Sequence, residues 1–223
     1  MCKYIFTFLF FLGFSTVLQA GETYSEIEEL VQRNPGQLSV AEYSLIAETL
    51  TSHSPCNMLV FGLGNDSDLW HRLNQHGTTL FLENNAFWYD KICTDFPQVN
   101  ALLVEYNTTR PQWKSLLKRD KEEELLLDLP SHVWDTKWDL IFVDAPEGWA
   151  DDKPGRMQSI YTAAKLASKS GGCHIFVHDC HRKVEAAFSS KYLGDRHLQC
   201  ELDRLRHYYV KGSSMASRPQ NSE

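Results

Sequence analysis

NMLVFGLGNDS, residues 57–67, is the stretch that decides the fold. Its unbroken apolar run predicts a strand buried on both faces, and the Gly62-Leu63-Gly64 turn with the polar residues after it predicts the start of a helix. Glycines let the backbone approach a ligand closely, and the free N–H groups of a helix start donate hydrogen bonds. Nucleotide-like ligands bind at such turns, although an ordinary strand-to-helix turn has the same pattern.

A second apolar run, Thr79-Leu80-Phe81-Leu82, ends on Glu83. In a doubly wound sheet, an acidic residue at this position accepts hydrogen bonds from the ribose hydroxyls of an adenosine cofactor. The turn and the acid together therefore predict a nucleoside-binding half of the domain.

Length and composition suit one globular domain. The chain has 223 residues, 43% of them hydrophobic, and a formal net charge of -7, which argues against a general nucleic-acid binder. A local basic pocket would still suit an anionic polymer. The five cysteines beyond residue 20 are odd in number and lack CxxC spacing, so a zinc knuckle or a disulfide-stapled fold is not expected, while one or two bridges stay open.

The N-terminus indicates the compartment. Residues 1–20 carry Lys3, an apolar run and Ala20, which is the pattern of a signal peptide or a short signal anchor. Leu18 is not the small residue that cleavage prefers, so removal stays open. Asn107-Thr108-Thr109 is a glycosylation acceptor, which fits a secretory route. We expect a catalytic domain over 21–210 and a disordered tail over 211–223.

The remaining chain alternates predicted helices and strands. Helices over 22–54, broken near residue 35, are expected at the sheet edge. The third, fourth and fifth strands are expected at 101–106, 138–144 and 175–177, and antiparallel strands at 198–202 and 207–210. This pattern predicts an α/β doubly wound, Rossmann-like sheet with helices on both faces. Glu83, Asp144 and Asp179 then meet at the carboxyl edge of the sheet.

Several chemistries fit these strand ends. Asp144 and Asp179 are similar to the oxygen-ligand pair that holds a divalent metal in catechol-type methyltransferases. His178 and His181 are candidate ligands or a general base. Arg156, in a long loop over the site, is placed to bind a substrate carboxylate, or else it pairs with Asp151 or Asp152. Each of these residues also has a purely structural interpretation. A carboxylate can cap a helix or form a salt bridge, and a histidine can be a buried structural imidazole.

The motifs together resemble one family. The motifs that carry the likeness are Pro55-Cys56-Asn57 and the glycine turn, Asp66-Ser67, Trp70, Thr79 to Glu83, Val143-Asp144-Ala145-Pro146, Pro154-Gly155-Arg156-Met157, Ile160 to Ala163, His178-Asp179 and Arg182 to Glu185. In order and spacing, they are similar to the polysaccharide-biosynthesis domain family of glucuronoxylan 4-O-methyltransferases. The likeness covers roughly residues 27–210.

The resemblance implies an S-adenosylmethionine-dependent methyltransferase in the Golgi lumen. Its acceptor would be the 4-hydroxyl of glucuronic acid in glucuronoxylan or arabinogalactan. The implied site consists of catalytic Asp144, His178 and Asp179; cofactor-binding Gly62, Gly64, Asp66, Ser67, Glu83 and Asp144; substrate-binding Arg156 and Trp149; and a divalent metal on Asp144 and Asp179.

Two readings from other classes stay open. A non-catalytic polysaccharide-assembly protein would keep the same fold, and Asn84-Asn85 after Glu83, where the family usually continues with acidic residues, is the feature that allows it. A nicotinamide oxidoreductase would use the same turn and acid. Against that reading, Gly-Leu-Gly-Asn-Asp-Ser lacks the third glycine of the dinucleotide motif.

Overall fold

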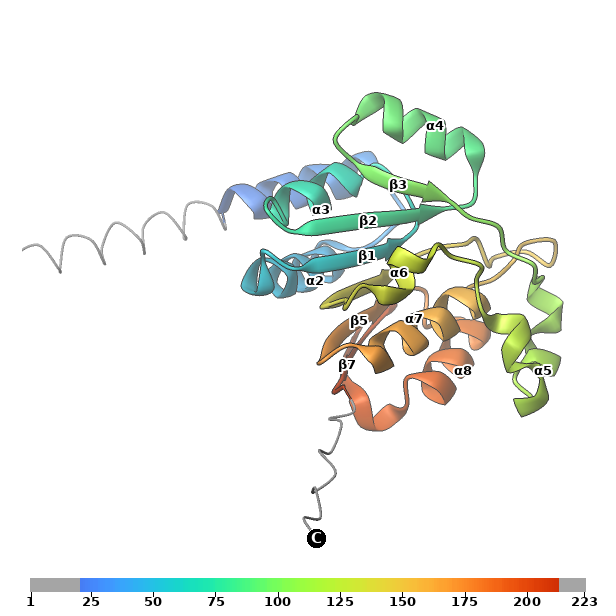
Figure 1. The fold of residues 1–223 in the computed structure, drawn as a ribbon. Helices are drawn as coiled ribbons and strands as arrows, with labels where there is room; N and C mark the ends of the chain where they lie inside the picture. The colour runs from blue at the N-terminus through green and yellow to red at the C-terminus, as the bar shows by residue number, and fades with distance from the viewer. Residues whose placement is uncertain (1–20, 213–223) are drawn as a thin grey trace, which may run out of the picture.

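The computed structural model describes residues 21–212, so the predicted leader over 1–20 and most of the predicted tail lie outside the described part of the chain. Seven strands form one sheet in the order β3-β2-β1-β4-β5-β7-β6 (Figure 1). The strands are β1 (Asn57–Phe61), β2 (Thr78–Glu83), β3 (Asn100–Leu103), β4 (Leu140–Val143), β5 (Cys173–Val177), β6 (Leu198–Leu202) and β7 (Leu205–Val210). The first five are parallel, and β7 runs antiparallel to both β5 and β6.

Alternate residues of the strands pack into two separate hydrophobic cores, one on each face of the sheet. Leu59 and Phe61 pack in one hydrophobic cluster, whereas Met58 and Val60 pack in the other. Every residue of β1 after Asn57 is buried, which explains why the strand reads as a continuous apolar run. The sheet is therefore doubly wound, as predicted.

Helices cover both faces. One face carries the helical residues 21–33 together with α2 (Val40–His53), α3 (Ser67–Leu73) and α4 (Ala86–Asp95). The other face carries α5 (Trp113–Leu116), α6 (Ser131–Asp135), α7 (Met157–Lys169) and α8 (Lys183–Tyr192). Short 3-10 turns lie at Arg110–Gln112, Arg119–Leu125 and Asp195–His197.

Two predictions about elements were wrong. The helices within 21–53 do not pack at the sheet edge: Ile46 and Leu50 of α2 lie in one cluster with Phe142 and Phe176. Central strands with two apolar faces need cover on both sides, and these helices provide it. The third strand is also shorter than predicted, because it ends at Leu103.

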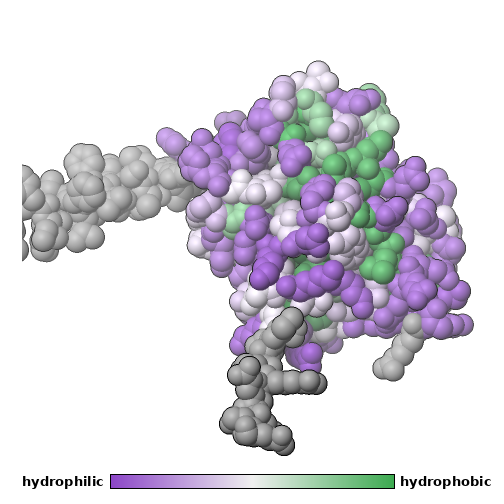
Figure 2. Space-filling view, viewed as in Figure 1, coloured by the Kyte–Doolittle hydropathy of each residue, from purple (hydrophilic) through white to green (hydrophobic). Residues whose placement is uncertain are grey.

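Figure 2 shows a largely hydrophilic surface with a band of apolar residues across it. Among residues 21–212, the exposed large apolar side chains are Tyr24, Phe87, Leu103, Leu126 and Trp149. Within the same range, no helix has the length and apolar character needed to cross a bilayer. All five cysteines of the described chain are free thiols.

Asn74 joins the start of β1 to the start of β2. Its side chain is 2% exposed. Its Oδ1 accepts from the backbone N–H of Cys56 at 3.0 Å, and its Nδ2 donates to the Cys56 carbonyl at 2.9 Å and to Thr79 Oγ1 at 3.0 Å. Asn74 is therefore the partner of the Cys56 N–H, and it shares the Cys56 carbonyl with the Thr78 N–H.

We expect Asn74→Ala to lower the free energy of unfolding by about 1–3 kcal/mol, because it leaves the buried Cys56 N–H without a partner. Urea denaturation measures the loss. The neighbouring exposed Gln75→Ala is the matched control and should change stability by less than about 0.5 kcal/mol. Equal effects of the two variants would contradict this account of Asn74.

Candidate active site

A cavity of about 710 Å³ opens at the carboxyl ends of the parallel strands. Its volume lies within the range of pockets for small ligands. All but one of the predicted site residues line it: Gly62, Gly64, Asp66, Glu83, Asp144, Trp149, Arg156, His178 and Asp179. The structure thus gathers residues from the ends of β1, β2, β4 and β5 in one place.

The glycine turn after β1 lies directly under the loop that follows β4. Gly62 has φ of 120°, and a Cβ added there would lie 3.2 Å from Ala145 Cβ. A side chain at this position would be strained and would also push against the loop. Beside it, the Gly64 N–H donates to Ser67 Oγ at 2.9 Å. Ser67 is buried behind the turn and shapes it, whereas the sequence predicted that it binds the cofactor.

Glu83 closes the turn from the neighbouring strand. Its Oε2 accepts from the Leu63 N–H at 2.9 Å, and its Oε1 accepts from the N–H groups of Asn84 at 2.8 Å and Asn85 at 2.6 Å. Burial raises the pKa of this carboxyl, and the three backbone donors only partly oppose that rise. The donors fix the carboxylate in one orientation at the cavity wall.

Asp66, at the start of α3, lines the same cavity as Glu83. Its Oδ2 accepts from Trp70 Nε1 at 3.0 Å. Burial and the nearby Asp144 raise the pKa of Asp66 to about 6, although the bond from Trp70 opposes the rise. Asp66 is thus a partly buried acceptor at the cavity wall.

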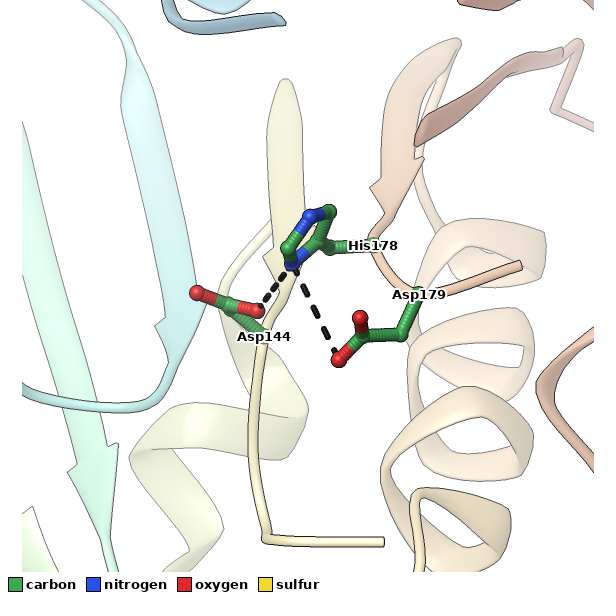
Figure 3. Close-up of side chains that lie close together, drawn as sticks. All are labelled: Asp144, His178 and Asp179. Carbon is green, nitrogen blue, oxygen red and sulfur yellow. Dashed lines mark hydrogen bonds and ion pairs between the residues drawn. The ribbon is translucent and has the colours of Figure 1, made fainter. Parts of the chain in front are cut away.

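Four polar side chains form a connected cluster at the ends of β4 and β5. Asp144 follows β4, His178 and Asp179 follow β5, and their side chains point toward one another (Figure 3). His178 Nδ1 lies 2.8 Å from Asp144 Oδ1. Arg156 Nη2 lies 3.0 Å from the same oxygen and 2.9 Å from Asp179 Oδ2. One guanidinium therefore bridges both carboxylates.

The environment of Asp144 favours its charged form. Burial alone would raise its pKa, but Arg156 and His178 outweigh burial and hold the pKa of Asp144 below its ordinary value. The Asp144 side chain is 21% exposed, whereas Arg156 and Asp179 are each 6% exposed. Asp144 is thus the carboxylate of the cluster that most faces the cavity.

Arg156 does not have the role predicted from the sequence. Besides the two carboxylates, it donates from Nη1 to the His178 carbonyl at 2.9 Å and from Nε to the Pro146 carbonyl at 3.3 Å. Among the described residues, its ion-pair partners are Asp144 and Asp179 and not the predicted alternatives Asp151 and Asp152; Asp151 pairs with Arg110. Because its donors are engaged inside the protein, Arg156 organises the site rather than presenting a free charge.

His178 is enclosed on both sides. Its side chain is 2% exposed, and Nε2, which lies 3.8 Å from Glu42 Oε1, has no hydrogen-bond partner among the described residues. Glu42 is a site residue that the sequence analysis missed, because its capping-box pattern with Ser39 indicates only a helix start. Its contact with His178 arises because α2 covers this face of the sheet.

Other cations that line the cavity are partly exposed. Arg182 and Arg204 line the cavity with side chains 28% and 32% exposed. Arg182 Nη1 lies 2.9 Å from Asp179 Oδ2. Trp149, in the loop after β4, lines the same cavity and is 63% exposed. His181 is also exposed, with Nδ1 3.9 Å from Asp179.

The predicted metal ligands do come together. Asp144, His178 and Asp179 each offer one ligand atom, and these atoms lie within 4.8 Å of one another. However, Arg156 already lies between the two carboxylates. As arranged here, the cluster does not fit a metal shared by Asp144 Oδ1 and Asp179 Oδ2, because the guanidinium holds both oxygens.

Two features define a class I S-adenosylmethionine-dependent methyltransferase fold. One is the strand order, with antiparallel β7 between β5 and β6, and the other is the glycine turn that faces an acid at the end of β2. The chain belongs to the IRX15/IRX15L/GXM family, whose model matches residues 41–208.

Relatives in Arabidopsis thaliana match most of the chain. Arabinogalactan O-methyltransferase 2 is 36% identical over 205 residues, which cover 82% of this chain and 70% of the relative. Glucuronoxylan 4-O-methyltransferase 1 is 38% identical over 191 residues, 78% of this chain and 68% of the relative. Protein IRREGULAR XYLEM 15 is 38% identical over 195 residues, 78% of this chain and 61% of the relative.

Solved structures are more distant. A TehB-like S-adenosylmethionine-dependent methyltransferase from Corynebacterium glutamicum is 14% identical, with a TM-score of 0.48 over 86% of this chain and 97% of that one. A methyltransferase-like protein from Silicibacter pomeroyi is 16% identical, with a TM-score of 0.43 over 75% and 85%.

Replacing Arg156 by methionine would leave Asp144 and Asp179 without their shared cation. Arg156 helps to depress the pKa of Asp144, so its ion pair contributes stability that is present above about pH 4 and is lost as the pH falls below that value. We therefore expect Arg156→Met to lower the free energy of unfolding by about 3–5 kcal/mol at neutral pH. The loss should shrink on acidification, as the carboxylates take up protons. Urea denaturation at neutral and acidic pH tests this, and an equal loss at both would contradict it.

Proposed function

We propose that this protein is an S-adenosylmethionine-dependent O-methyltransferase that acts on the 4-hydroxyl of glucuronic acid residues in a glucuronoxylan- or arabinogalactan-like polysaccharide. The observation that carries the proposal is the Asp144 carboxylate, which is held ionised at the cavity wall beside the glycine turn. Family membership and the names of the relatives support the acceptor class.

The donor half of the cavity suits an adenosine ligand. Gly62 and Gly64 leave room for the methionine part to approach the backbone, and the fixed carboxylate of Glu83 accepts hydrogen bonds from ribose hydroxyls. The backbone groups of Asn84 and Asn85 continue this wall. We assign Asp66 to the same half, as an acceptor across the turn.

Asp144 is the group that receives the proton. Methyl transfer converts the attacking hydroxyl into a strongly acidic oxonium, so a carboxylate with a low pKa is a sufficient base once the C–O bond forms. Oδ1 of Asp144 is occupied by His178 and Arg156, which leaves Oδ2 for the acceptor hydroxyl. His178 and Asp179 then position Asp144, because both are buried and bonded within the cluster.

Arg182 is the better candidate to bind the uronate. It lines the cavity, it is partly exposed, and its ion pair with Asp179 uses only Nη1. An arginine with free donors can bind a carboxylate through two parallel hydrogen bonds. Exposed Trp149 lies at the same wall, and its ring suits the apolar side of a neighbouring sugar ring of the acceptor glycan.

A second candidate function is a non-catalytic role in polysaccharide assembly. It is favoured by the 38% identity to Protein IRREGULAR XYLEM 15, whose name states no transferase activity. Such a protein would keep the fold and bind the methyl donor poorly. The intact contacts of Glu83 and Asp144 favour the enzyme.

We also propose that the protein works in the secretory pathway, in the Golgi lumen, with membrane attachment only through residues 1–20 if they are retained. The support is the sequence pattern of that segment and the exposed position of Asn107 in its glycosylation motif. A glycosylated product on expression in a secretory host, lost on Asn107→Gln, is the corresponding check.

We expect Asp144→Asn to lower turnover by about 10²- to 10⁴-fold, because the amide cannot take up the proton, while affinity for S-adenosylmethionine stays near that of the wild type. Transfer of a labelled methyl group to glucuronic-acid-bearing xylo-oligosaccharides, with the product position assigned by NMR, measures this. Asp152→Asn, an exposed carboxylate in the same cavity wall, is the control. Wild-type turnover by Asp144→Asn would remove Asp144 from catalysis, and a methyl group at another hydroxyl would contradict the acceptor position.

A divalent metal on Asp144 and Asp179 stays a prediction of the sequence, and it requires Arg156 to leave both carboxylates. We therefore expect Arg156→Met to bind Mn²⁺ or Mg²⁺ more tightly than the wild type, since it removes the cation that lies between the two carboxylates. Calorimetric titration with each ion measures the difference. Tighter binding by the wild type would show that the metal site lies elsewhere.

A further inference from the structure

A second cavity adjoins the first. It has a volume of about 510 Å³ and lies between the 3-10 turn at Arg110–Gln112, the loop after β4 and the start of α8. Two tryptophans, Trp113 and Trp149, and the carboxylic acid Glu185 line it, so we call it the tryptophan cavity. Trp149 and Arg182 line both cavities, which makes them the shared wall.

Glu185 is the unusual member of this lining. It is fully buried in the first turn of α8, and neither of its carboxylate oxygens has a hydrogen-bond partner among the described residues. Burial raises the pKa of Glu185, although Arg156 and Arg182 oppose the rise. A buried carboxyl group without partners costs stability. Its position beside a cavity points to a ligand that supplies hydrogen-bond donors.

Gly148 makes room for this carboxyl group. A Cβ added at Gly148 would lie 2.7 Å from Glu185 Oε1, so any side chain there would displace the acid. The glycine stands in the loop that also carries Trp149. The loop therefore brings the Trp149 ring to the cavity, and its glycine leaves room there for the carboxyl group that α8 supplies.

The other residues that line the tryptophan cavity indicate which class of ligand it would bind. Trp149 is 63% exposed. Among the charged side chains of the lining, Arg110 pairs with Asp151 and Arg182 pairs with Asp179, so their charges are matched inside the protein. Apolar ring faces together with a buried acceptor suit a molecule that has C–H-rich faces and hydroxyl donors at its rim. A pyranose ring has both features, whereas a purely apolar ligand would leave Glu185 unsatisfied.

We propose that the tryptophan cavity binds a neutral pyranose residue of the acceptor glycan, next to the uronic acid that the main cavity receives. Its hydroxyls donate to Glu185, and its ring packs on Trp149. Arg182, in the shared wall, then lies at the boundary between the neutral sugar and the uronate. This inference rests on the proposed function for the identity of the acceptor, and it extends that function from one sugar to an oligosaccharide.

The test compares two ligands on the full chain. One is a xylo-oligosaccharide that carries a glucuronic acid branch, and the other is methyl glucuronoside, which is too small to fill both cavities. Calorimetric titration in the presence of S-adenosylhomocysteine gives both affinities for the wild type, Trp149→Ala and Glu185→Gln. Exposed Tyr24→Ala and Glu48→Gln are the matched controls, because neither residue lines the main cavity or the tryptophan cavity.

We expect Trp149→Ala and Glu185→Gln each to weaken oligosaccharide binding by about tenfold or more, and to weaken glucuronoside binding much less. Glu185→Gln should not lower the melting temperature, since the carboxyl group makes no hydrogen bond that the protein would lose. A destabilised Glu185→Gln with wild-type oligosaccharide affinity would assign the residue a structural role and overturn the proposal. Equal weakening of both ligands, or of neither, would also overturn it.

The readout separates this inference from the proposed function. If the oligosaccharide binds with the expected pattern but receives no methyl group, the cavity is a glycan site and the transferase proposal fails. If the glucuronoside is methylated while neither variant changes oligosaccharide affinity, the transferase proposal stands and the tryptophan cavity is not a sugar site.

Discussion

The guanidinium of Arg156 is the group on which the site depends. It is buried, it contacts Asp144 and Asp179 within 3.0 Å, and it also donates to the carbonyls of His178 and Pro146. These contacts join the ends of β4 and β5 to the loop between β4 and α7. Two carboxylates this close would otherwise share a proton. With Arg156 present, Asp144 stays charged, so the site has an anionic oxygen at the cavity wall.

In the half of the cavity assigned to the methyl donor, one side chain likewise makes several fixing contacts. The side chain of Glu83 accepts three backbone N–H groups and so fixes the turn after β1 against the end of β2. Gly62 allows the loop after β4 to lie against that turn. The two halves of the cavity are therefore built on adjacent parallel strands, and small movements of either strand are resisted by hydrogen bonds at its end. A sulfonium methyl group held between such fixed groups needs mainly alignment with the acceptor oxygen.

Much of this arrangement could be predicted from the sequence. Parallel strands place their carboxyl ends at one edge, so Glu83, Asp144 and Asp179 had to converge once the apolar runs were read as strands. The partners of individual side chains could not be predicted. The pattern around Arg156 shows a loop cation but not which carboxylates it meets, and the capping box at Glu42 says nothing of His178, which is reached only because α2 covers the sheet face. Periodicity likewise shows that helices 21–53 are amphipathic without showing which surface they cover.

The central claim is that the cavity at the ends of β1 and β2 binds S-adenosylmethionine through the glycine turn and Glu83. Calorimetric titration of the purified protein with S-adenosylmethionine, and separately with NAD, tests it most directly, with Glu83→Ala as the variant. The account predicts saturable binding of S-adenosylmethionine alone, lost in Glu83→Ala. Binding of NAD would indicate an oxidoreductase, and binding of neither compound by a folded protein would contradict the methyltransferase account and favour the assembly role.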